Sequence, residues 1–317
     1  MTNKQVEAEF ALAEEAIREH ANIVVRTDTM DRLDWLRTRK IGLGSADAAP
    51  SLGLSKAGWG GPLSTWADKI SDEVSDDETE RQKWGRRLEE PVGLGIAEDI
   101  GLPVRRFPYM LQSIEWPFMT ANLDFIAPRS NVEVKLVDRF MAYEWDDGAV
   151  PMHYTIQGQH ANAVTGQDGT HFLALIGGNT ARAIYVARND ALIESLVEAE
   201  RQFWKLVEDQ TPPDVDGLPS TTEALKRLYV DPEAGAEVEL PGEAVELIAQ
   251  RATVKAAMAE QKLALDEIEN QLRLWLGRAE IGTVNGTTVV TWKQSDYKGY
   301  YVEPRTSRRF NFPKAAK

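Results

Sequence analysis

The stretch FMTANLDFIAPRSNVEVKLV, residues 118–137, decides the fold and carries the chemistry of this chain. Its last seven residues alternate between polar and apolar, which is the pattern of a half-buried strand. Because side chains two apart on a strand point the same way, Glu133 and Lys135 share one face while Val132 and Val134 face the core. The sequence therefore predicts a charged pair held on a rigid strand.

A second carboxylate belongs to the same group. Asp124 lies one strand earlier, across a turn at 128–130, close enough for its carboxylate to meet that of Glu133. Two carboxylates and the carbonyl of Val134 suit a hard divalent cation such as Mg²⁺, and Lys135 can orient a water or neutralise charge on a phosphate. This is the chemistry of phosphodiester hydrolysis, although the same spacing of charges also occurs on ordinary exposed strands.

The flanking sequence predicts an α/β core with one mixed sheet flanked by helices. Proline, glycine and the polar capping residues set the predicted boundaries. The predicted elements are a surface helix over 4–20, a helix over 80–100 that Pro91 kinks or restarts, paired strands over 104–115 and 118–127 joined at Trp116-Pro117, the strand 131–137, a helix from Pro151 to Thr165 closed by Gly166, strands 171–177 and 181–188 meeting at Gly178-Asn179, and a helix capped by Asn189 or Asp190 that ends near Gln210.

The composition changes after Pro213, which predicts a division into a core over 1–212, a linker over 213–242 and a C-terminal appendage over 243–317. The appendage should hold a long helix to Gly277, a hairpin turning at Asn285-Gly286, and a basic tail. The apolar stripe of the long helix predicts a packing face, and the tail carries four cations: Arg305, Arg308, Arg309 and Lys314.

Composition excludes several classes of protein. The chain has no cysteine, so disulfides, Cys-ligated zinc and iron–sulfur clusters are ruled out, and its four histidines lack the spacing of a zinc site. No run of about 18 apolar residues appears and the N-terminus is acidic, so we expect a cytoplasmic protein without a membrane partner. A net charge of −14 means that any DNA substrate requires basic residues concentrated in one channel.

Several short segments together resemble the YqaJ viral recombinase and phage lambda exonuclease family, a branch of the PD-(D/E)XK nucleases. The resemblance covers roughly residues 32–205. The matching pieces occur in family order: Trp35-Leu36, IGLGSADAAPSLGLS (41–55), Trp66 with Lys69, GRRLEEP (85–91), the NLDF and VEVK strands, and PMHYTIQGQH (151–160). The resemblance implies a PD-(D/E)XK, restriction-endonuclease-like core.

The resemblance also implies roles for individual residues. Asp124 and Glu133 match the metal-binding acids and Lys135 the catalytic lysine of the family. Three further matches are Glu89 on the preceding helix and Tyr154 and Gln157 on the helix after the strand.

A 5′-phosphate pocket is implied as well, formed by an arginine and a serine. Arg39 and Ser45 are the candidates. Arg37 is a rival for the arginine, and an alignment from the DAA side puts Ala46 in the serine position.

The activity implied is a Mg²⁺-dependent exonuclease, with two ions, that accepts Mn²⁺ as a substitute. It would digest linear double-stranded DNA from its ends in the 5′-to-3′ direction and leave 3′ single-stranded overhangs for strand annealing. The implied partners are DNA ends, a single-strand annealing protein and further copies of the chain in a trimeric or tetrameric ring, in a bacterial host of a phage or prophage. No G-x-x-x-x-G-K-[ST] segment occurs, which predicts independence of ATP. The alternatives are an endonuclease of the same fold and a non-catalytic DNA-end-binding or scaffold protein.

Overall fold

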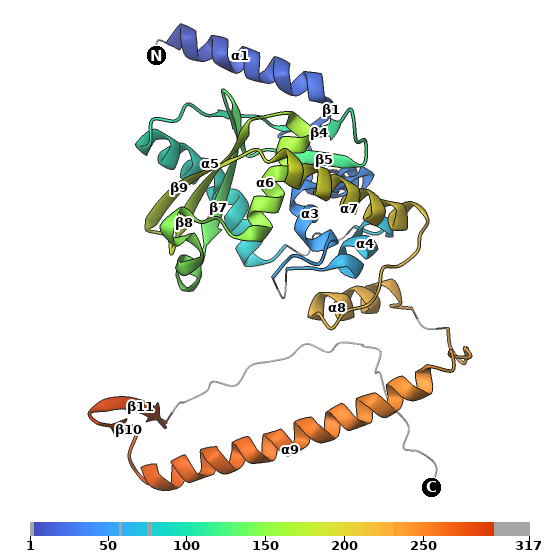
Figure 1. Ribbon diagram of the computed structural model, residues 1–317, viewed down its shortest axis with the longest axis vertical. Coiled ribbons are helices and arrows are strands. Elements are labelled where there is room, and N and C mark those ends of the chain that lie inside the picture. Colours follow the sequence, from blue (N-terminus) through green and yellow to red (C-terminus); the bar gives the residue numbers. More distant parts are fainter. Residues whose placement is uncertain (1–2, 57–58, 75, 77, 232, 295–317) are drawn as a thin grey trace. The chain divides into compact units, whose positions relative to one another are not determined.

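The computed structural model of the protein describes residues 3–56, 59–74, 76, 78–231 and 233–294 (Figure 1). The chain divides into two compact units, Met1–Val230 and Asp231–Lys317. The first unit is a mixed α/β structure that contains the stretch 118–137, and it has two mixed sheets where the sequence predicted one.

The larger sheet has five strands in the order β3-β6-β7-β8-β9. Its central strands β7 and β8 are parallel and all other neighbours are antiparallel. The predicted strand 131–137 is thereby confirmed as β7, and Asn131 and Val137 are aligned with Thr170 and Ile176 of β8. The strands are β3 (Arg105–Arg106), β6 (Phe125–Ala127), β7 (Ser130–Val137), β8 (Gly169–Ile176) and β9 (Thr180–Ala187).

The smaller sheet has four strands in the order β1-β4-β5-β2. Strand β2 pairs in parallel with β5, and the other pairs are antiparallel. Each strand of the predicted pair joined at Trp116-Pro117 is broken into two: 104–115 contains β3 and β4, and 118–127 contains β5 and β6, with one member of each in either sheet. The pair joined at Trp116-Pro117 is that of β4 with β5, β3 pairs with β6 in the larger sheet, and β1 and β2 were not predicted. The strands are β1 (Ala21–Arg26), β2 (Leu43–Gly44), β4 (Tyr109–Ser113) and β5 (Met119–Asn122).

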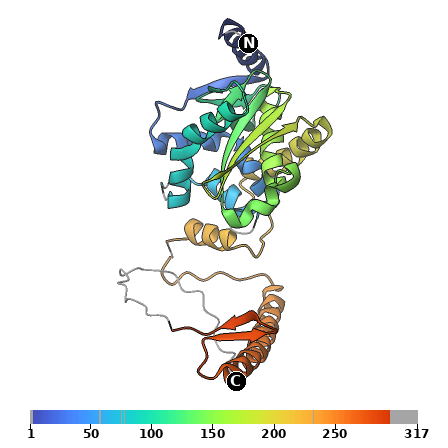
Figure 2. The same ribbon diagram turned by 90° about the vertical axis from the view of Figure 1, so that its left-hand side faces the viewer.

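Two helices cover the two faces of the five-stranded sheet. Helix α5 (Glu80–Asp99) packs Ile96 and Ala97 against Val132 and Val134 of β7, and Figure 2 shows it in teal on one side of the strands. Helix α6 (Met152–Thr165) lies on the opposite face. The alternation in β7 therefore points Val132 and Val134 at α5 and leaves Glu133 and Lys135 for the α6 face.

Helix α6 begins and ends where the sequence predicted. Pro151 precedes its first residue, and Gly166 adopts a left-handed conformation (φ 70°) and donates its N–H to the carbonyl of Asn162. Most of the helix is buried because it packs against both sheets. Inside it, Asn162 and Thr165 accept hydrogen bonds from the Asn131 amide of β7 at 2.9 and 3.0 Å.

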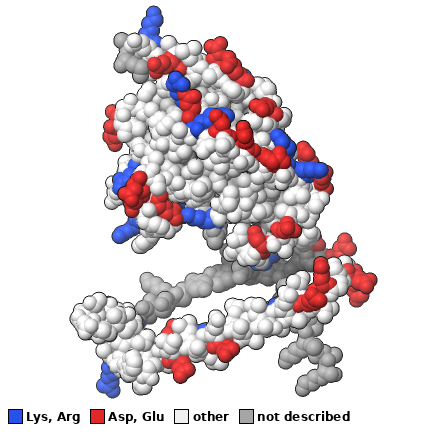
Figure 3. All heavy atoms as spheres, viewed as in Figure 1, with Lys and Arg blue, Asp and Glu red and all other residues white. Residues whose placement is uncertain are grey.

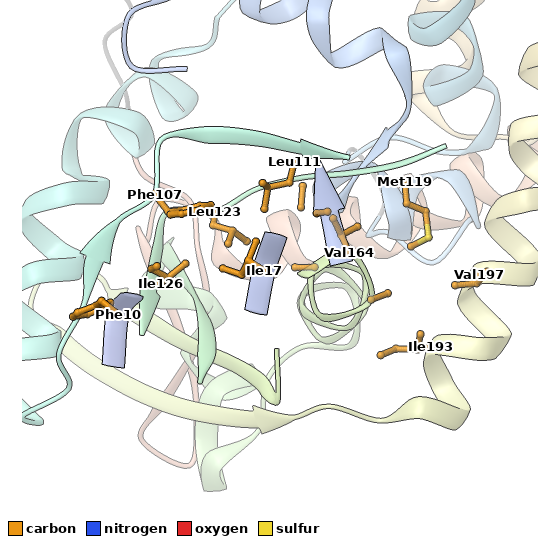
Figure 4. Close-up of a cluster of buried hydrophobic side chains, with 14 residues drawn as sticks. Phe10, Ile17, Phe107, Leu111, Met119, Leu123, Ile126, Val164, Ile193 and Val197 are labelled. Atoms are coloured by element: carbon orange, nitrogen blue, oxygen red, sulfur yellow. The ribbon is translucent and has the colours of Figure 1, made fainter. Parts of the chain in front are cut away.

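A core cluster joins α6 to the smaller sheet and to the two helices that pack beside it. Figure 4 shows Phe10 and Ile17 of α1 (Asn3–His20) in this cluster together with Leu111 and Val164. The prediction of a helix over 4–20 is confirmed, but its apolar face packs into the core and is not a surface feature. Helix α7 (Asp190–Glu208) contributes Ile193 and Val197, and its cap is Asn189, which accepts from the N–H of Leu192.

Two local predictions require correction. Helix α5 does not restart at Pro91 but runs from Glu80 to Asp99 with the proline inside it. The turn between β8 and β9 is centred on Gly177 and Gly178, both of which have positive φ, one residue earlier than predicted.

The segment between β1 and α5 forms short elements that the sequence pattern did not define. They pack Leu43, Leu63 and Trp66 against Phe203 of α7 and Ala224. Ala224 belongs to α8 (Pro219–Leu228), so the predicted linker over 213–242 contains a helix that belongs to the first unit. The short elements are α2 (Arg32–Thr38), η1 (Arg39–Ile41), α3 (Ser45–Ser51) and α4 (Pro62–Ile70), and η2 (Arg139–Gly148) follows β7.

The second unit contains α9 (Ala244–Leu276) and a hairpin of β10 (Ile281–Val284) and β11 (Thr287–Thr291). The hairpin turn at Asn285-Gly286 is confirmed, with φ values of 49° and 78°. No residue of α9 is buried, so within the described part of the second unit its apolar stripe has no packing partner. The basic tail from Arg305 to Lys314 lies outside the described residues. No helix in the described part of the chain is long and apolar enough to span a membrane.

Candidate active site

A cavity of about 260 Å³ lies where β7 passes the start of α6. It brings together side chains from segments that are distant in the sequence. Its walls come from the region of η1 and α3, from α5, from the end of β5 and from β7, through Trp35, Arg39, Gly44, Ser45, Ala46, Gly85, Glu89, Asn122, Asp124, Glu133, Val134, Lys135, Leu136 and Gln157. Most of the predicted site residues therefore line one cavity.

Glu133 is the most deeply buried acid of this cavity, with 2% of its surface exposed. One carboxylate oxygen, Oε2, accepts from the Lys135 ammonium at 2.8 Å and from the Gln157 amide at 2.7 Å. The other oxygen, Oε1, is buried and has no hydrogen-bond partner among the described residues. A buried carboxylate oxygen without a donor is costly, so this atom marks a position where a cation or a further donor is needed.

Asp124 lies between β5 and β6 and faces the same strand. Its Oδ2 accepts the backbone N–H of Val134 at 2.7 Å. In a strand the N–H and C=O of one residue leave on the same side, so the Val134 carbonyl also points away from β8 and toward Asp124. Asp124 and this carbonyl thus share one side of β7, and Glu133 lines the same cavity.

Burial and neighbouring charges shift the pKa values of the acids and the lysine in the cavity. Burial raises the pKa of Asp124 to about 7, and the nearby charge of Glu89 adds to this effect. Burial likewise raises the pKa of Glu133 to about 7, with Asp124 adding and Lys135 opposing. Burial alone would lower the pKa of Lys135, but the two carboxylates outweigh it and hold that pKa above its usual range. A charged lysine therefore lies beside two acids whose pKa values are close to neutral pH.

Glu89 reaches the cavity from α5. Burial raises its pKa, while the guanidinium of Arg106, 3.3 Å from its Oε1, acts in the opposite direction. Its neighbour Glu90 is more exposed and lies 3.8 Å from the same guanidinium. The structure therefore places Glu89, and not Glu90, among the cavity residues.

Tyr154 and Gln157 lie one turn apart at the start of α6. Gln157 contacts Glu133 directly, as described above. Tyr154 does not line the cavity, but the Lys135 ammonium lies 5.1 Å from its ring centroid. Attraction between a cation and an aromatic ring at this distance helps to fix the lysine.

Some of the residues predicted to bind the 5′-phosphate line the cavity and one does not. Arg39 and Ser45 line the cavity, and the buried Ser45 hydroxyl has no hydrogen-bond partner within the described residues. Ala46 also lines the cavity but offers no side-chain donor. Arg37 does not line it, because its guanidinium is exposed and bonds Asp34 on the surface of α2 at 2.7 Å.

Comparison with known proteins identifies the family. Residues 34–168 match the YqaJ-like viral recombinase domain. The chain is also 31% identical over 280 residues to the uncharacterized protein YqaJ of Bacillus subtilis (strain 168), covering 86% of each chain. The chain belongs to the YqaJ-like viral recombinase family.

Two solved structures that resemble part of this chain are named as exonucleases. An alkaline exonuclease from Laribacter hongkongensis, LHK-Exo, is 17% identical with a TM-score of 0.48, over 62% of this chain and 97% of that one. A phage-related exonuclease from Haemophilus somnus 129PT is 13% identical with a TM-score of 0.40, over 53% of this chain and 96% of that one.

Sequence reasoning missed the residue that supports Arg39 in this YqaJ-like protein. Asp47 of α3 accepts from Arg39 and from the buried Lys69 of α4, both at 2.6 Å, and from the N–H of Gly44 at 3.1 Å. Burial opposes ionisation of Asp47, but Arg39 and Lys69 outweigh it and hold its pKa well below the usual range. Only the position of Asp47 next to the Gly-Ser-Ala segment hinted at this role.

Asn122 was also missed. It is the last residue of β5 and lines the cavity, and its Oδ1 is buried without a partner among the described residues. The signal available in the sequence was its place two residues before Asp124.

Proposed function

We propose that this chain is a Mg²⁺-dependent, ATP-independent exonuclease that digests linear double-stranded DNA from its ends. The observation that carries the proposal is the meeting of Asp124, Glu133 and Lys135 with Arg39 and Ser45 in one small cavity. Acids for a metal, a lysine for developing charge and donors for a phosphate are what phosphodiester hydrolysis requires.

The donor set fits a hard cation. Asp124, the unpartnered Oε1 of Glu133 and the Val134 carbonyl are oxygen atoms of the kind that Mg²⁺ prefers, and Mn²⁺ accepts the same ligands. Within the described residues no group of three His, Asp or Glu side chains is arranged to hold a metal ion, so the proposal relies on two carboxylates, one carbonyl and waters as ligands. When bound, Mg²⁺ polarises the scissile phosphate and lowers the pKa of a water. Glu89 is the candidate for contact with a second ion.

The other residues position the reacting groups. Gln157 and Lys135 hold Oε2 of Glu133, which leaves Oε1 directed at the ion site. Lys135 keeps its proton because two acids surround it, so it can donate to the attacking water or to the phosphate oxygen that gains charge.

A 5′-phosphate at the DNA end would bind Arg39 and Ser45. Arg39 presents a guanidinium held by Asp47, and Ser45 presents a buried hydroxyl without a partner in the described chain. A phosphate there supports digestion in the 5′-to-3′ direction, which leaves 3′ overhangs for phage-type recombination.

The wider setting is also a proposal. We expect double-stranded DNA ends and a single-strand annealing protein as partners, a trimeric or tetrameric ring of this chain, and a cytoplasmic location in a host that carries the phage or prophage. The family membership supports this setting.

The decisive experiment incubates end-labelled linear duplex and covalently closed circular duplex with the protein and Mg²⁺. Loss of the linear DNA alone supports the exonuclease, loss of both identifies an endonuclease, and loss of neither identifies a binding or scaffold protein. Two controls are needed, one with EDTA and one with Glu133→Gln. Activity that persists in EDTA would contradict the metal proposal, and activity that persists in Glu133→Gln would reveal a contaminating nuclease or contradict the site.

A further inference from the structure

An exposed tryptophan lies beside the cavity and outside its walls. The ring of Trp59 contacts His153 and Tyr154 of α6 edge-on, with centroids 5.0 and 5.8 Å apart. Tyr154 in turn has the Lys135 ammonium 5.1 Å from its centroid. A single aromatic ring therefore separates Trp59 from the proposed catalytic lysine.

Arginines accompany the exposed tryptophans. The guanidinium carbon of Arg81 lies 5.6 Å from the Trp59 ring centroid, and that of Arg87 lies 5.4 Å from the ring of Trp84. Trp59 is 43% exposed and Trp84 is 50% exposed, so both offer ring surface to a ligand.

Helix α5 connects this surface to the cavity. One side of the helix carries three residues that are each four positions apart: Arg81, Gly85 and Glu89. Gly85 and Glu89 line the cavity, and Arg81 continues the same row to Trp59. A ligand that leaves the cavity along this row meets a cation and an aromatic ring next.

We propose that Trp59, with Arg81 and Trp84, forms a stacking platform for the bases of unpaired nucleotides next to the cavity. This inference rests on the proposed function, because it assigns the part of the DNA that adjoins the scissile phosphate. Exposed aromatic rings stack on any base, and arginines neutralise the phosphates between bases. Bases inside a duplex are already stacked on one another, so the platform favours a strand that has separated from its partner.

The test measures binding without cleavage. The full-length protein is titrated, in Ca²⁺ instead of Mg²⁺, into a fluorescent single-stranded oligothymidylate with a 5′-phosphate. We expect Trp59→Ala to weaken binding by roughly tenfold, the scale of one lost base stack, and Trp59→Phe to retain most of the affinity. Trp292→Ala is the matched control, because Trp292 is 52% exposed but belongs to the second unit. This variant should bind the oligonucleotide as tightly as the unmutated protein.

A second readout uses 2-aminopurine placed in the single-stranded oligothymidylate, where it is unpaired and fluorescent. Stacking on a tryptophan quenches this base, so the fluorescence should fall on binding to the unmutated protein and fall less with Trp59→Ala. Trp84 is 50% exposed and lies one turn from Arg81 on α5, so Trp84→Ala tests the platform even if Trp59→Ala unfolds.

The outcomes separate the platform from the nuclease. If the unmutated protein digests linear DNA while both tryptophan variants bind the oligonucleotide as tightly as it does, the platform is wrong and the proposed function stands. If the variants weaken binding but no preparation digests DNA, the platform stands and the proposed function fails. Equal loss of binding in Trp292→Ala would also overturn the platform, because the effect would not belong to this surface.

Discussion

Lys135 and the two acids around it have separable roles, and conservative variants distinguish them. Asp124→Asn and Glu133→Gln keep the hydrogen bonds to Val134 and Lys135 but remove ligand charge, so both should abolish cleavage and weaken Mg²⁺ binding. Lys135→Ala leaves the acids in place, so Mg²⁺ should still bind while turnover falls by ~10²-fold or more. Isothermal titration with Mg²⁺ and steady-state digestion of linear duplex measure the two effects.

Two adjacent glutamates provide the control for this prediction. Glu89 lines the cavity and Glu90 does not, although both lie near Arg106. Glu89→Gln should reduce turnover and Glu90→Gln should not. Near-normal turnover of folded Lys135→Ala, or equal damage from both glutamate variants, would contradict the assignment.

Arg39 and Arg37 form a second matched pair, two residues apart. Arg39 faces the cavity and Arg37 bonds Asp34 in solvent. A charge-assisted contact to phosphate contributes roughly 1.5–3 kcal/mol, so unmutated protein should digest 5′-phosphorylated ends about ten- to a hundredfold faster than unphosphorylated ends. Arg39→Ala should erase most of that ratio and Arg37→Ala should preserve it. Equal rates on both ends in the unmutated protein would reject the phosphate pocket.

His160 is a buried imidazole of α6 beside a buried acid. Its Nδ1 lies 2.9 Å from Glu200 and its Nε2 lies 3.0 Å from the carbonyl of Thr120, and all three residues are buried. A carboxylate and a carbonyl both accept hydrogen bonds, so these two partners favour the doubly protonated ring. Burial lowers the pKa of His160, but Glu200 outweighs it and the net shift is upward.

This raised pKa predicts a pH dependence of stability. The contribution of His160 is complete below its unfolded pKa of about 6.5 and is lost as pH rises through the higher folded value. The free energy of urea unfolding should therefore differ more between unmutated protein and His160→Gln at pH 6 than at pH 9. A difference that does not change with pH would show that the imidazolium contributes nothing.

At the scale of elements, the sequence predicted best where one local rule determined the outcome. The alternation in β7, the Pro151 and Gly166 boundaries of α6 and the Asn189 cap of α7 all follow from local geometry. The grouping of Asp124, Glu133 and Lys135 followed from the same alternation together with one turn.

Other elements depended on partners distant in the sequence. Strand β2 is only two residues long and exists because Leu43 and Gly44 pair with β5, and β1 pairs with β4 across more than 80 residues. No local pattern defines such strands, so the second sheet was missed. The Asp47–Lys69 pair was missed for the same reason, since the packing of α3 on α4 brings its members together.

Helix α5 offers a test of how closely the fold supports the site. A Cβ atom on Gly93 would lie 2.5 Å from the Phe125 ring and 2.9 Å from a Val134 methyl, whereas a Cβ on Gly95 would meet nothing within 4 Å. Gly93→Ala should destabilise the protein and displace β7, while Gly95→Ala should stabilise it by up to about 1 kcal/mol through helix propensity. Chemical unfolding of the two variants measures this, and equal effects would mean that α5 is not packed tightly against β7.

For the whole molecule, the charge of −14 leaves little basic surface for DNA. On the face drawn in Figure 3, the described Lys and Arg side chains lie singly or in small groups beside Asp and Glu. They form no continuous basic strip on that face. Several copies around one duplex would combine such small groups. We therefore expect the proposed ring to bring more Lys and Arg side chains to the DNA than one chain can supply.

Helix α9 is the surface that we expect to serve in that assembly. Its seven-residue repeat with alternating steps of four and three is typical of a coiled-coil seam, and its members are Leu247, Arg251, Val254, Met258, Gln261, Leu265, Ile268, Leu272 and Trp275. Light scattering of the unmutated protein should give a trimer or tetramer, and Leu265→Asp should lower the mass. Leu263→Asp is the control, because Leu263 is exposed and lies off the seam. A monomer at micromolar concentration, or equal effects of the two variants, would contradict the prediction.

The unpartnered oxygen of Glu133 also has a consequence for the lifetime of the molecule. Without a cation, Asp124 and Glu133 favour the folded state less as pH rises through about 7, because each must then ionise inside the protein. A cation present at a hundred times its dissociation constant raises the free energy of unfolding by roughly 2.7 kcal/mol. In a cell, that difference changes how often a chain unfolds and meets a protease. The abundance of the protein should therefore follow the supply of free divalent cation as well as the rate of its synthesis.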